Sequence, residues 1–341
     1  MFLLRDASAA DFEGLAHAAK HLNSVNLPDD REHLRRLIER SEKSFAGKLE
    51  AAKRELLFVL IDEESGRVVG ASMIFAQHGT RRAPHIYFDV LDEERYSETL
   101  DRHVTHKVLR IGYNYNGLTE IGGLVLLPEL RGHPDQLGKL LSYVRFLYIA
   151  THRDVFRDEM VSELMPPLEA DGTSLLWESL GRNFTGLGYA EADRLSRENK
   201  EFIRTLFPQD PLYTCLLPKN VQELIGQVGP GTKGVEKMLR AIGFEYAQRI
   251  DPFDGGPHFH ARTDDITLVK AARQTTLLDA AAASVGVPAL ISVESREPPF
   301  FRAVRGMVKW EGASVAVDGA TRARLGLQPG GELAVLSLSV R

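Results

Sequence analysis

The stretch Ile121–Ser142, IGGLVLLPELRGHPDQLGKLLS, decides how the rest of the chain is interpreted. Its first part, up to Leu127, is rich in branched apolar residues and predicts a buried strand. Pro128 ends that strand, and a loop with Gly132 leads into an apolar helix. The first N–H groups of a helix lack partners within the helix, and the helix dipole favours a negative charge at the same end. The segment therefore predicts a site for a phosphate-bearing ligand.

Two common nucleotide motifs do not fit this stretch. No Gly-Lys-Ser/Thr follows the strand, as a P-loop requires, and the G-x-G-x-x-G spacing of a dinucleotide fingerprint is absent. The alternative to a phosphate site is an ordinary connection between a strand and a helix.

The composition is that of an ordinary globular protein. The 341 residues, 43% of them hydrophobic and 26% charged, are enough for a large core and two domains. A formal net charge of −5, without a basic block, argues against nucleic-acid binding. The single cysteine, Cys215, excludes a disulfide framework, and no spacing of His, Asp and Glu indicates a metal site. We expect a cytoplasmic protein that does not bind membranes, because signal-peptide and membrane-span patterns are absent.

Strand-like and helix-like patterns are mixed along the chain. Residues 55–76 predict the clearest hairpin, with Gly66 in the turn between two β-rich runs. Residues 31–52 predict an amphipathic helix, and residues 97–109 a helix or an irregular segment. The fold class predicted from these elements is α+β, with a sheet and flanking helices.

The C-terminal part differs from the rest. From Pro288 onward, short strands alternate with Gly and Asp turns, as in a small β-barrel-like extension. We therefore predict a first domain over residues 1–268 and a second, β-rich domain over residues 269–341. An alternative divides the first domain further, with residues 158–268 as an inserted or duplicated half.

Four longer motifs point to a known family. They are LLWESLGRNF at residues 175–184, FPQDPLY at 207–213, IGQVGPGT at 225–232 and IDPFDGGPHFHART at 250–263. In this order they resemble the arginine N-succinyltransferase family, which includes the alpha subunit of arginine/ornithine succinyltransferases. The resemblance implies the acyl-CoA N-acyltransferase fold of the GNAT superfamily, with a mixed sheet, flanking helices and a C-terminal β extension.

The resemblance also implies an activity. Family members transfer a succinyl group from succinyl-CoA to the α-amine of L-arginine, in arginine catabolism. It implies acyl-CoA as a co-substrate, no permanently bound cofactor, and a homo-oligomer or a hetero-oligomer with a sister subunit. The family's succinyl-CoA contact falls on Leu124, where backbone atoms of the strand can bind the pantetheine arm. The other predicted acyl-CoA-binding residues are Val125, Leu126, Arg131, Gly132, Gly138 and Lys139.

The chain departs from the family at one important position. The family's proton-donating histidine stands in a G-Q-V-H-P motif, and this chain has Gly229 in its place. Glycine carries no proton, but aminolysis of a positioned thioester gains most of its rate from proximity, so activity without that histidine is chemically feasible. Two alternatives remain open: an N-acyltransferase for another amine such as ornithine, and a catalytically weak CoA-binding or structural subunit.

Acylation of an amine requires a group that takes the proton of the ammonium. Glu120, at the start of the central strand, and His258, in a predicted strand, are the candidate catalytic residues. A guanidinium binds carboxylates with two hydrogen bonds, so Asp251, Asp254 and Glu163 are the candidate substrate-binding residues. The alternative roles are structural: the two aspartates can cap the glycine turn between them, and the others can be ordinary strand residues.

Overall fold

The computed structural model describes residues 1–22, 27, 30–81, 83–196, 199–279 and 286–339. The contacts within the chain group it into two units. The first unit comprises Met1–Gln77, Thr119–Met160 and Arg262–Arg341, and the second comprises His78–Leu118 and Val161–Ala261. Each unit is therefore assembled from stretches that are separated in the sequence. The domain boundary near residue 269 stays a prediction.

The first unit contains most of the strands. They are β1 (Phe2–Asp6), β2 (Glu55–Asp62), β3 (Arg67–Phe75), β6 (Thr119–Leu126), β11 (Arg273–Thr276), β12 (Val287–Glu294), β13 (Phe301–Glu311), β14 (Ser314–Val317) and β15 (Glu332–Ser337). Its α-helices are α1 (Phe12–Ala19), α2 (Arg31–Phe45), α3 (Leu137–Thr151), α9 (Thr267–Ala271) and α10 (Gly319–Leu325). Among the described residues of the whole chain, no helix is both long enough and apolar enough for a membrane crossing.

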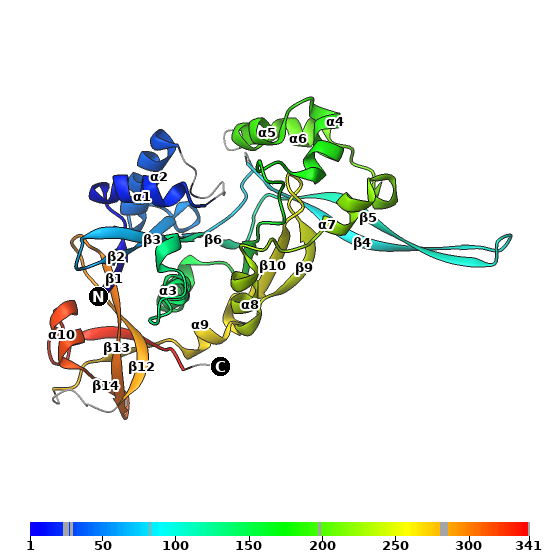
Figure 1. Cartoon of the computed structure of the whole chain (residues 1–341). Helices are drawn as coiled ribbons and strands as arrows, with labels where there is room; N and C mark the ends of the chain where they lie inside the picture. Colours follow the sequence, from blue (N-terminus) through cyan, green and yellow to red (C-terminus); the bar gives the residue numbers. More distant parts are fainter. Residues whose placement is uncertain (23–26, 28–29, 82, 197–198, 280–285, 340–341) are drawn as a thin grey trace. The chain divides into compact units, whose positions relative to one another are not determined.

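The strands of the first unit are hydrogen-bonded in the order β11-β15-β12-β13-β1-β2-β3-β6, with β14 paired to β13. Helices α1 and α2 lie on one face of β1–β3, and α3 lies on the other (Figure 1). Phe58, Ile74 and Phe146 are fully buried between these layers. The hairpin predicted at residues 55–76 is confirmed as β2 and β3, with the predicted turn glycine, Gly66, at φ +68°.

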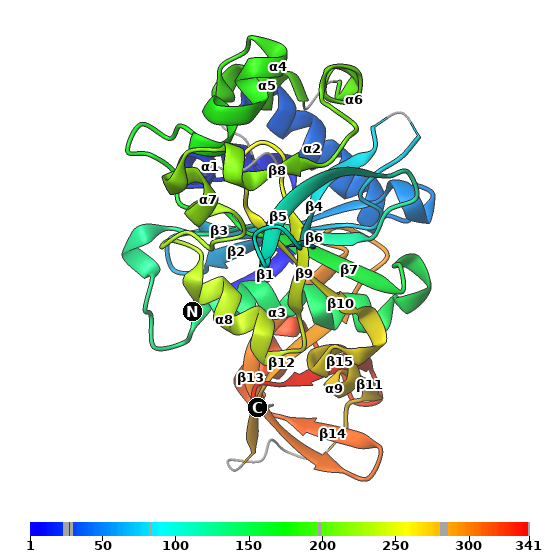
Figure 2. The same cartoon turned by 90° about the vertical axis from the view of Figure 1, so that its right-hand side faces the viewer.

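Beyond residue 269, five short strands pair around a separate small core. The order β11-β15-β12-β13-β14 is closed by a bridge between Leu277 and Val315, and the N–H of Leu278 donates to the carbonyl of Val315 at 2.9 Å. Val304, Val308 and the bridge residues are buried inside this ring of strands. Figure 2 shows β11 and β15 side by side, next to α9.

The second unit combines a twisted sheet with a group of short helices. Its strands are β4 (His85–Ser97), β5 (Arg102–Asn114), β7 (Glu159–Glu163, which begins in the first unit), β8 (Leu212–Tyr213), β9 (Glu245–Ile250) and β10 (Pro257–Arg262). Its α-helices are α4 (Arg182–Thr185), α5 (Tyr189–Ser196), α6 (Glu201–Leu206), α7 (Lys219–Leu224) and α8 (Lys233–Ala241). Its strands are ordered β7-β10-β9-β4-β5-β8. Trp177 and Phe253, stacked with their centroids 4.8 Å apart, lie in its apolar core.

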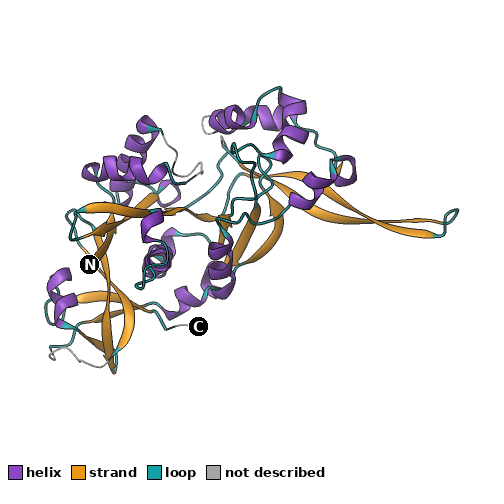
Figure 3. Ribbon diagram, viewed as in Figure 1, coloured by secondary structure: helices purple, strands orange, loops and turns teal. Residues whose placement is uncertain are grey.

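Strands β4 and β5 form a long two-stranded ribbon that extends beyond the helices of its unit (Figure 3). The pairing runs without interruption from His85 opposite Asn114 to Ser97 opposite Arg102. The prediction of a helix or an irregular segment at residues 97–109 is therefore wrong. The hydrogen bonds that hold this segment extended come from β4, a partner that the segment's own sequence does not show.

Candidate active site

Strand β6 carries a bulge at the residues predicted to contact acyl-CoA. Val125 and Leu126 pair with β3, but the register shifts between Ala71 and Met73, so that Leu124 falls in the irregular part. The preceding residue, Gly123, has φ +57°, a left-handed conformation that glycine adopts without strain. A bulge leaves one residue of a strand outside the ladder of hydrogen bonds. The backbone around Leu124 is therefore suited to bind the amide groups of a pantetheine arm.

The connection from β6 into α3 has the features of an anion site. The N-cap residue of α3, Gln136, adopts φ 55°, and its side chain makes no capping hydrogen bond. The Cα positions of Gly132 and Gly138 face open space, since a Cβ added at either would meet nothing within 4 Å. A negatively charged ligand can therefore approach the first turn of the helix. The residues predicted to bind the phosphates all lie along this connection: Arg131, Gly132, Gly138 and Lys139.

Arg145, in the middle of α3, is a buried cation. Its residue is 2% exposed, and its guanidinium donates to the hydroxyl of Ser142 at 2.8 Å, to the carbonyl of Ser142 at 3.2 Å and to the carbonyl of Gly122 on β6 at 3.4 Å. All three acceptors are neutral, and among the described residues no carboxylate forms an ion pair with Arg145. Burial lowers the pKa of Arg145 to about 9. The guanidinium is therefore a buried charge that lacks a negative partner, beside the strand predicted to carry the acyl-CoA.

Glu120, the predicted general base, is buried at the start of β6. It is 1% exposed and faces Phe75 of β3, which in turn faces Glu55 of β2. Burial, together with the charge of Glu120, raises the pKa of Glu55, although Arg40 lies 3.0 Å from the Glu55 carboxylate and opposes that shift. A second carboxylate nearby favours a proton on one of the two. Glu120 is therefore not a solvent-exposed residue at the end of a strand.

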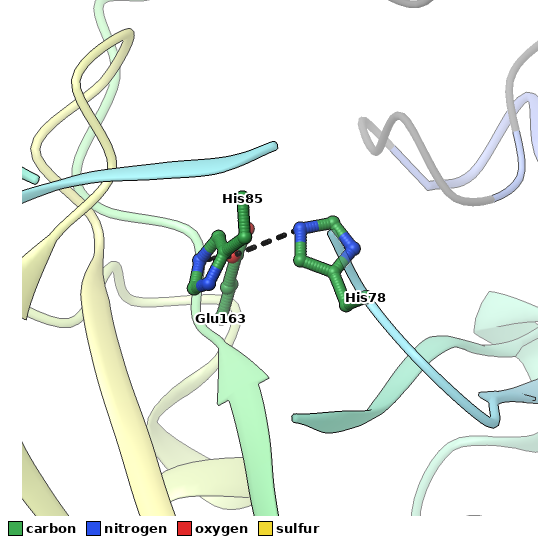
Figure 4. A group of neighbouring side chains, drawn as sticks. All are labelled: His78, His85 and Glu163. Atoms are coloured by element: carbon green, nitrogen blue, oxygen red, sulfur yellow. Dashed lines mark ion pairs between the residues drawn. The ribbon is translucent and has the colours of Figure 1, made fainter. Parts of the chain in front are cut away.

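The other candidates lie in the second unit, around Glu163 at the end of β7. Three histidine rings point their Nε2 atoms at one oxygen, Glu163 Oε1: His85 at 3.0 Å, His258 at 3.5 Å and His78 at 4.0 Å. Figure 4 shows His78, His85 and Glu163 turned toward one another from a loop, the start of β4 and the end of β7. The rings of His85 and His258 are also stacked, with centroids 5.2 Å apart. We call these four residues the histidine–glutamate cluster.

Burial and charge act against each other in this cluster. Burial opposes ionisation of Glu163, but His258 and His85 hold the pKa of that carboxyl well below its usual range. Burial lowers the pKa of His85, against the attraction of Glu163. Glu163, His78 and His85 have ligand atoms within 4.8 Å of one another, and so do Glu163, Asp251 and His258, which is a spacing that a metal ion can occupy.

Asp251 and Asp254 have the capping role considered as an alternative. The Asp251 carboxylate accepts the N–H of Phe253 at 2.6 Å, and the Asp254 carboxylate accepts the N–H of Gly256 at 2.7 Å. Burial, assisted by the charge of Glu163, raises the pKa of Asp251 to about 7. These bonds shape the turn between β9 and β10, and a substrate-binding role for the two aspartates stays a prediction.

Gly229, at the position of the family's histidine, is closely packed. Its N–H donates to the carbonyl of Met165 at 2.8 Å. A Cβ atom at Gly229 would lie 2.5 Å from the carbonyl oxygen of Pro166, which is too close for any side chain. The backbone around Gly229 therefore leaves no room for a histidine side chain, and any side chain at this position requires the chain to move.

Sequence reasoning missed three residues of these sites: Arg145, His78 and His85. Arg145 could have been found, because it is the one charged residue inside the apolar run LLSYVRFLYIA. The two histidines carry no signal in the sequence, since they meet Glu163 and His258 only through the pairing of separate strands. The structure brings together Glu163, His258, Asp251 and Asp254 in the second unit, and Glu120 with the predicted acyl-CoA-binding residues in the first.

The chain is an α+β protein whose bulged central strand leads into an uncapped helix. This is the arrangement that the resemblance to acyl-CoA-dependent acyltransferases implied.

Comparisons with known proteins give the family. Residues 2–268 match the family described as arginine N-succinyltransferase beta subunit. A relative from Pseudomonas aeruginosa, named arginine N-succinyltransferase subunit beta, is 32% identical over 342 residues, which is 99% of each chain. An arginine N-succinyltransferase of Yersinia pestis is 35% identical over 255 residues, 74% of this chain and 72% of the relative. The solved structure of arginine/ornithine succinyltransferase subunit AI from Pseudomonas aeruginosa aligns with a TM-score of 0.84 and 31% identity, over 99% of this chain and 98% of that one.

The chain belongs to the arginine N-succinyltransferase family. The predictions of this family, of the α+β acyltransferase fold and of a transferase are confirmed. The roles of the individual site residues stay predictions.

Proposed function

We propose that the protein transfers a succinyl group from succinyl-CoA to the α-amine of L-arginine. Membership of the family supports both the reaction type and the amine. In this reaction the amine nitrogen attacks the thioester carbonyl, the carbon–sulfur bond breaks, and the thiolate of coenzyme A leaves. The ammonium loses one proton to a base before the attack, and the nitrogen loses a second proton as the amide forms; this second proton goes to the departing thiolate.

The observation that carries the choice of acyl group is Arg145. A succinyl group ends in a carboxylate, whereas an acetyl group does not. Arg145 offers a buried guanidinium that pairs with no carboxylate of the described residues, and it contacts Gly122, two residues before Leu124 on the same strand. A carboxylate bound by this guanidinium would gain a charge-assisted, bidentate pair and would neutralise the buried charge. The same group contributes nothing to the binding of an acetyl chain.

The remaining parts of the site have the following proposed roles. The backbone at Leu124 binds the pantetheine arm, and the start of α3, with Arg131 and Lys139, binds the phosphates. Glu120, buried on the same strand, takes the proton of the ammonium.

The test is release of coenzyme A by the purified protein, followed with a thiol reagent. Succinyl-CoA and acetyl-CoA are each offered with arginine, ornithine and lysine. The proposal expects turnover with succinyl-CoA and arginine above all other pairs. Turnover with ornithine alone would show the other amine to be the substrate.

A second candidate function follows from Gly229, because the position of the family's proton donor has no side chain. The relative from Pseudomonas aeruginosa is named as a subunit, which favours an assembly of several chains. If the protein binds coenzyme A in calorimetry but turns over no amine, the chain is a binding or structural subunit, and the proposed activity is wrong.

A further inference from the structure

The histidine–glutamate cluster contains a set of ligand atoms with the spacing that a metal ion requires. Nε2 of His85 and Nε2 of His78 lie 3.0 and 4.0 Å from Glu163 Oε1, and the ligand atoms of these three residues all lie within 4.8 Å of one another. His258, whose Nε2 lies 3.5 Å from the same oxygen, belongs with Glu163 and Asp251 to a second group of this kind.

The distances fit a small divalent cation. Zinc binds imidazole nitrogen and carboxylate oxygen at about 2.0–2.2 Å in a tetrahedral arrangement, which places neighbouring ligand atoms about 3.3 Å apart. The Nε2 to Oε1 distances of 3.0 Å for His85 and 4.0 Å for His78 lie around that value. Imidazole ligands suit zinc and neighbouring transition metals, whereas magnesium and calcium prefer oxygen ligands.

The ligands are held by rigid backbone. His85 begins β4 and is paired with Asn114 of β5. Glu163 ends β7, and the N–H of Leu164, directly after it, donates to the carbonyl of Pro257 on β10 at 3.1 Å. This bond fixes the end of β7 against the neighbouring strand.

The loop with His78 is equally constrained. The N–H of His78 donates to the carbonyl of Leu118 at 2.7 Å, and Gly79 follows with φ +96°. A Cβ at Gly117 would lie 1.5 Å from the carbonyl oxygen of His78, so only glycine allows this close approach. Strand and loop geometry therefore position the ligands before any ion binds, as a metal site requires.

The exposed fractions of the cluster side chains show from which side a metal ion can enter. The side chains of His85 and His258 are 4% and 1% exposed, whereas those of His78 and Glu163 are 24% and 22% exposed. An ion can thus reach the cluster from the side of His78 and Glu163 and end in a mostly buried position.

We propose that His78, His85 and Glu163 bind one divalent transition-metal ion of the zinc type. Two imidazoles and one carboxylate supply three ligands and leave the fourth position of a tetrahedral shell for water. The ion links the loop before β4, the start of β4 and the end of β7.

The experiment uses the full chain and zinc alone. The protein, stripped with a chelator, is dialysed against micromolar Zn²⁺, and its metal content is measured by mass spectrometry. We expect one equivalent per chain, and a higher melting temperature with zinc than without it, because an ion that binds only the folded state stabilises that state. Cobalt substituted for zinc should give the visible absorption bands of a tetrahedral site.

The variants H78Q and E163Q are expected to lose the bound equivalent and the thermal shift. The matched control is H103Q, which replaces an exposed histidine of β5 and should keep both. H78Q alters the more exposed ligand, so it remains informative if E163Q fails to fold. The proposal is overturned if the wild-type chain retains no stoichiometric metal, or if H78Q and H103Q bind zinc equally. Neither result depends on transfer activity, so a failed metal site is distinguishable from a failed succinyltransferase.

Discussion

Replacement of Arg145 by methionine separates recognition of the succinyl group from all other functions of the site. Methionine has a similar length and fills the same apolar surroundings without charge. If Arg145 binds the succinyl carboxylate, the variant loses a buried, charge-assisted pair in the complex. Removal of one partner of such a pair costs about 2–5 kcal/mol, which corresponds to a loss of about 30-fold or more in kcat/KM for succinyl-CoA.

The same substitution should not reduce the stability of the protein without substrate, although it weakens the use of succinyl-CoA. Lowering of the Arg145 pKa from 12.5 to about 9 corresponds to roughly 5 kcal/mol against the charged form, at about 1.4 kcal/mol for each tenfold change in proton affinity. Removal of a buried charge without a partner is neutral or stabilising in many proteins. We therefore expect Arg145→Met to leave the melting temperature unchanged or to raise it.

The assay compares kcat/KM of the wild type and of Arg145→Met with succinyl-CoA and with acetyl-CoA, at saturating arginine. Acetyl-CoA is the internal control, because it shares the whole coenzyme but lacks the carboxylate. The ratio of the two values should fall by about 30-fold or more in the variant. An equal fall with both donors would refute the reasoning and would show that Arg145 only supports the packing of α3 on β6.

Three further changes test other parts of the protein. Glu120→Gln should lower kcat by about 10²–10⁴-fold and leave the calorimetric affinity for coenzyme A unchanged; an unaltered kcat would remove Glu120 as the base. Gly229→Ala should lower the free energy of unfolding by about 1–3 kcal/mol, because the new Cβ meets the carbonyl of Pro166. The control Gly231→Ala adds a Cβ in open space and should leave the free energy of unfolding unchanged. Equal denaturation midpoints for the two variants would contradict the predicted clash. Burial disfavours charge on His152, but Glu294, 3.2 Å away, raises the pKa of His152 above its usual value. The ion pair therefore stabilises the fold at low pH, and its contribution is lost as the pH rises above about 6.5. Glu294→Gln should flatten the dependence of the melting temperature on pH in that range, and an unchanged slope would refute the pairing.

Local sequence patterns were sufficient to predict the helices and strands that consist of one continuous apolar stretch. The hairpin of β2 and β3, the strand β6 and the helix α3 all follow from apolar runs and from turn residues such as Gly66 and Pro128. The order of family motifs likewise indicated the reaction class, because sequence similarity persists where the fold and chemistry are shared. Each of these features depends on residues close together in the chain, so the sequence alone revealed them.

The remaining features of the fold and of the candidate sites depend on contacts between segments that are distant in the sequence. The strand β5 is extended only because β4 lies beside it, and the three histidines of the cluster meet Glu163 only after four segments of the second unit have paired. The burial of Arg145 away from every carboxylate that the structure describes is also a property of packing, and so is the contact that the carbonyl oxygen of Pro166 would make with a Cβ at Gly229. Charge, proton affinity and metal affinity depend on what surrounds a side chain, and those surroundings exist only in the folded protein.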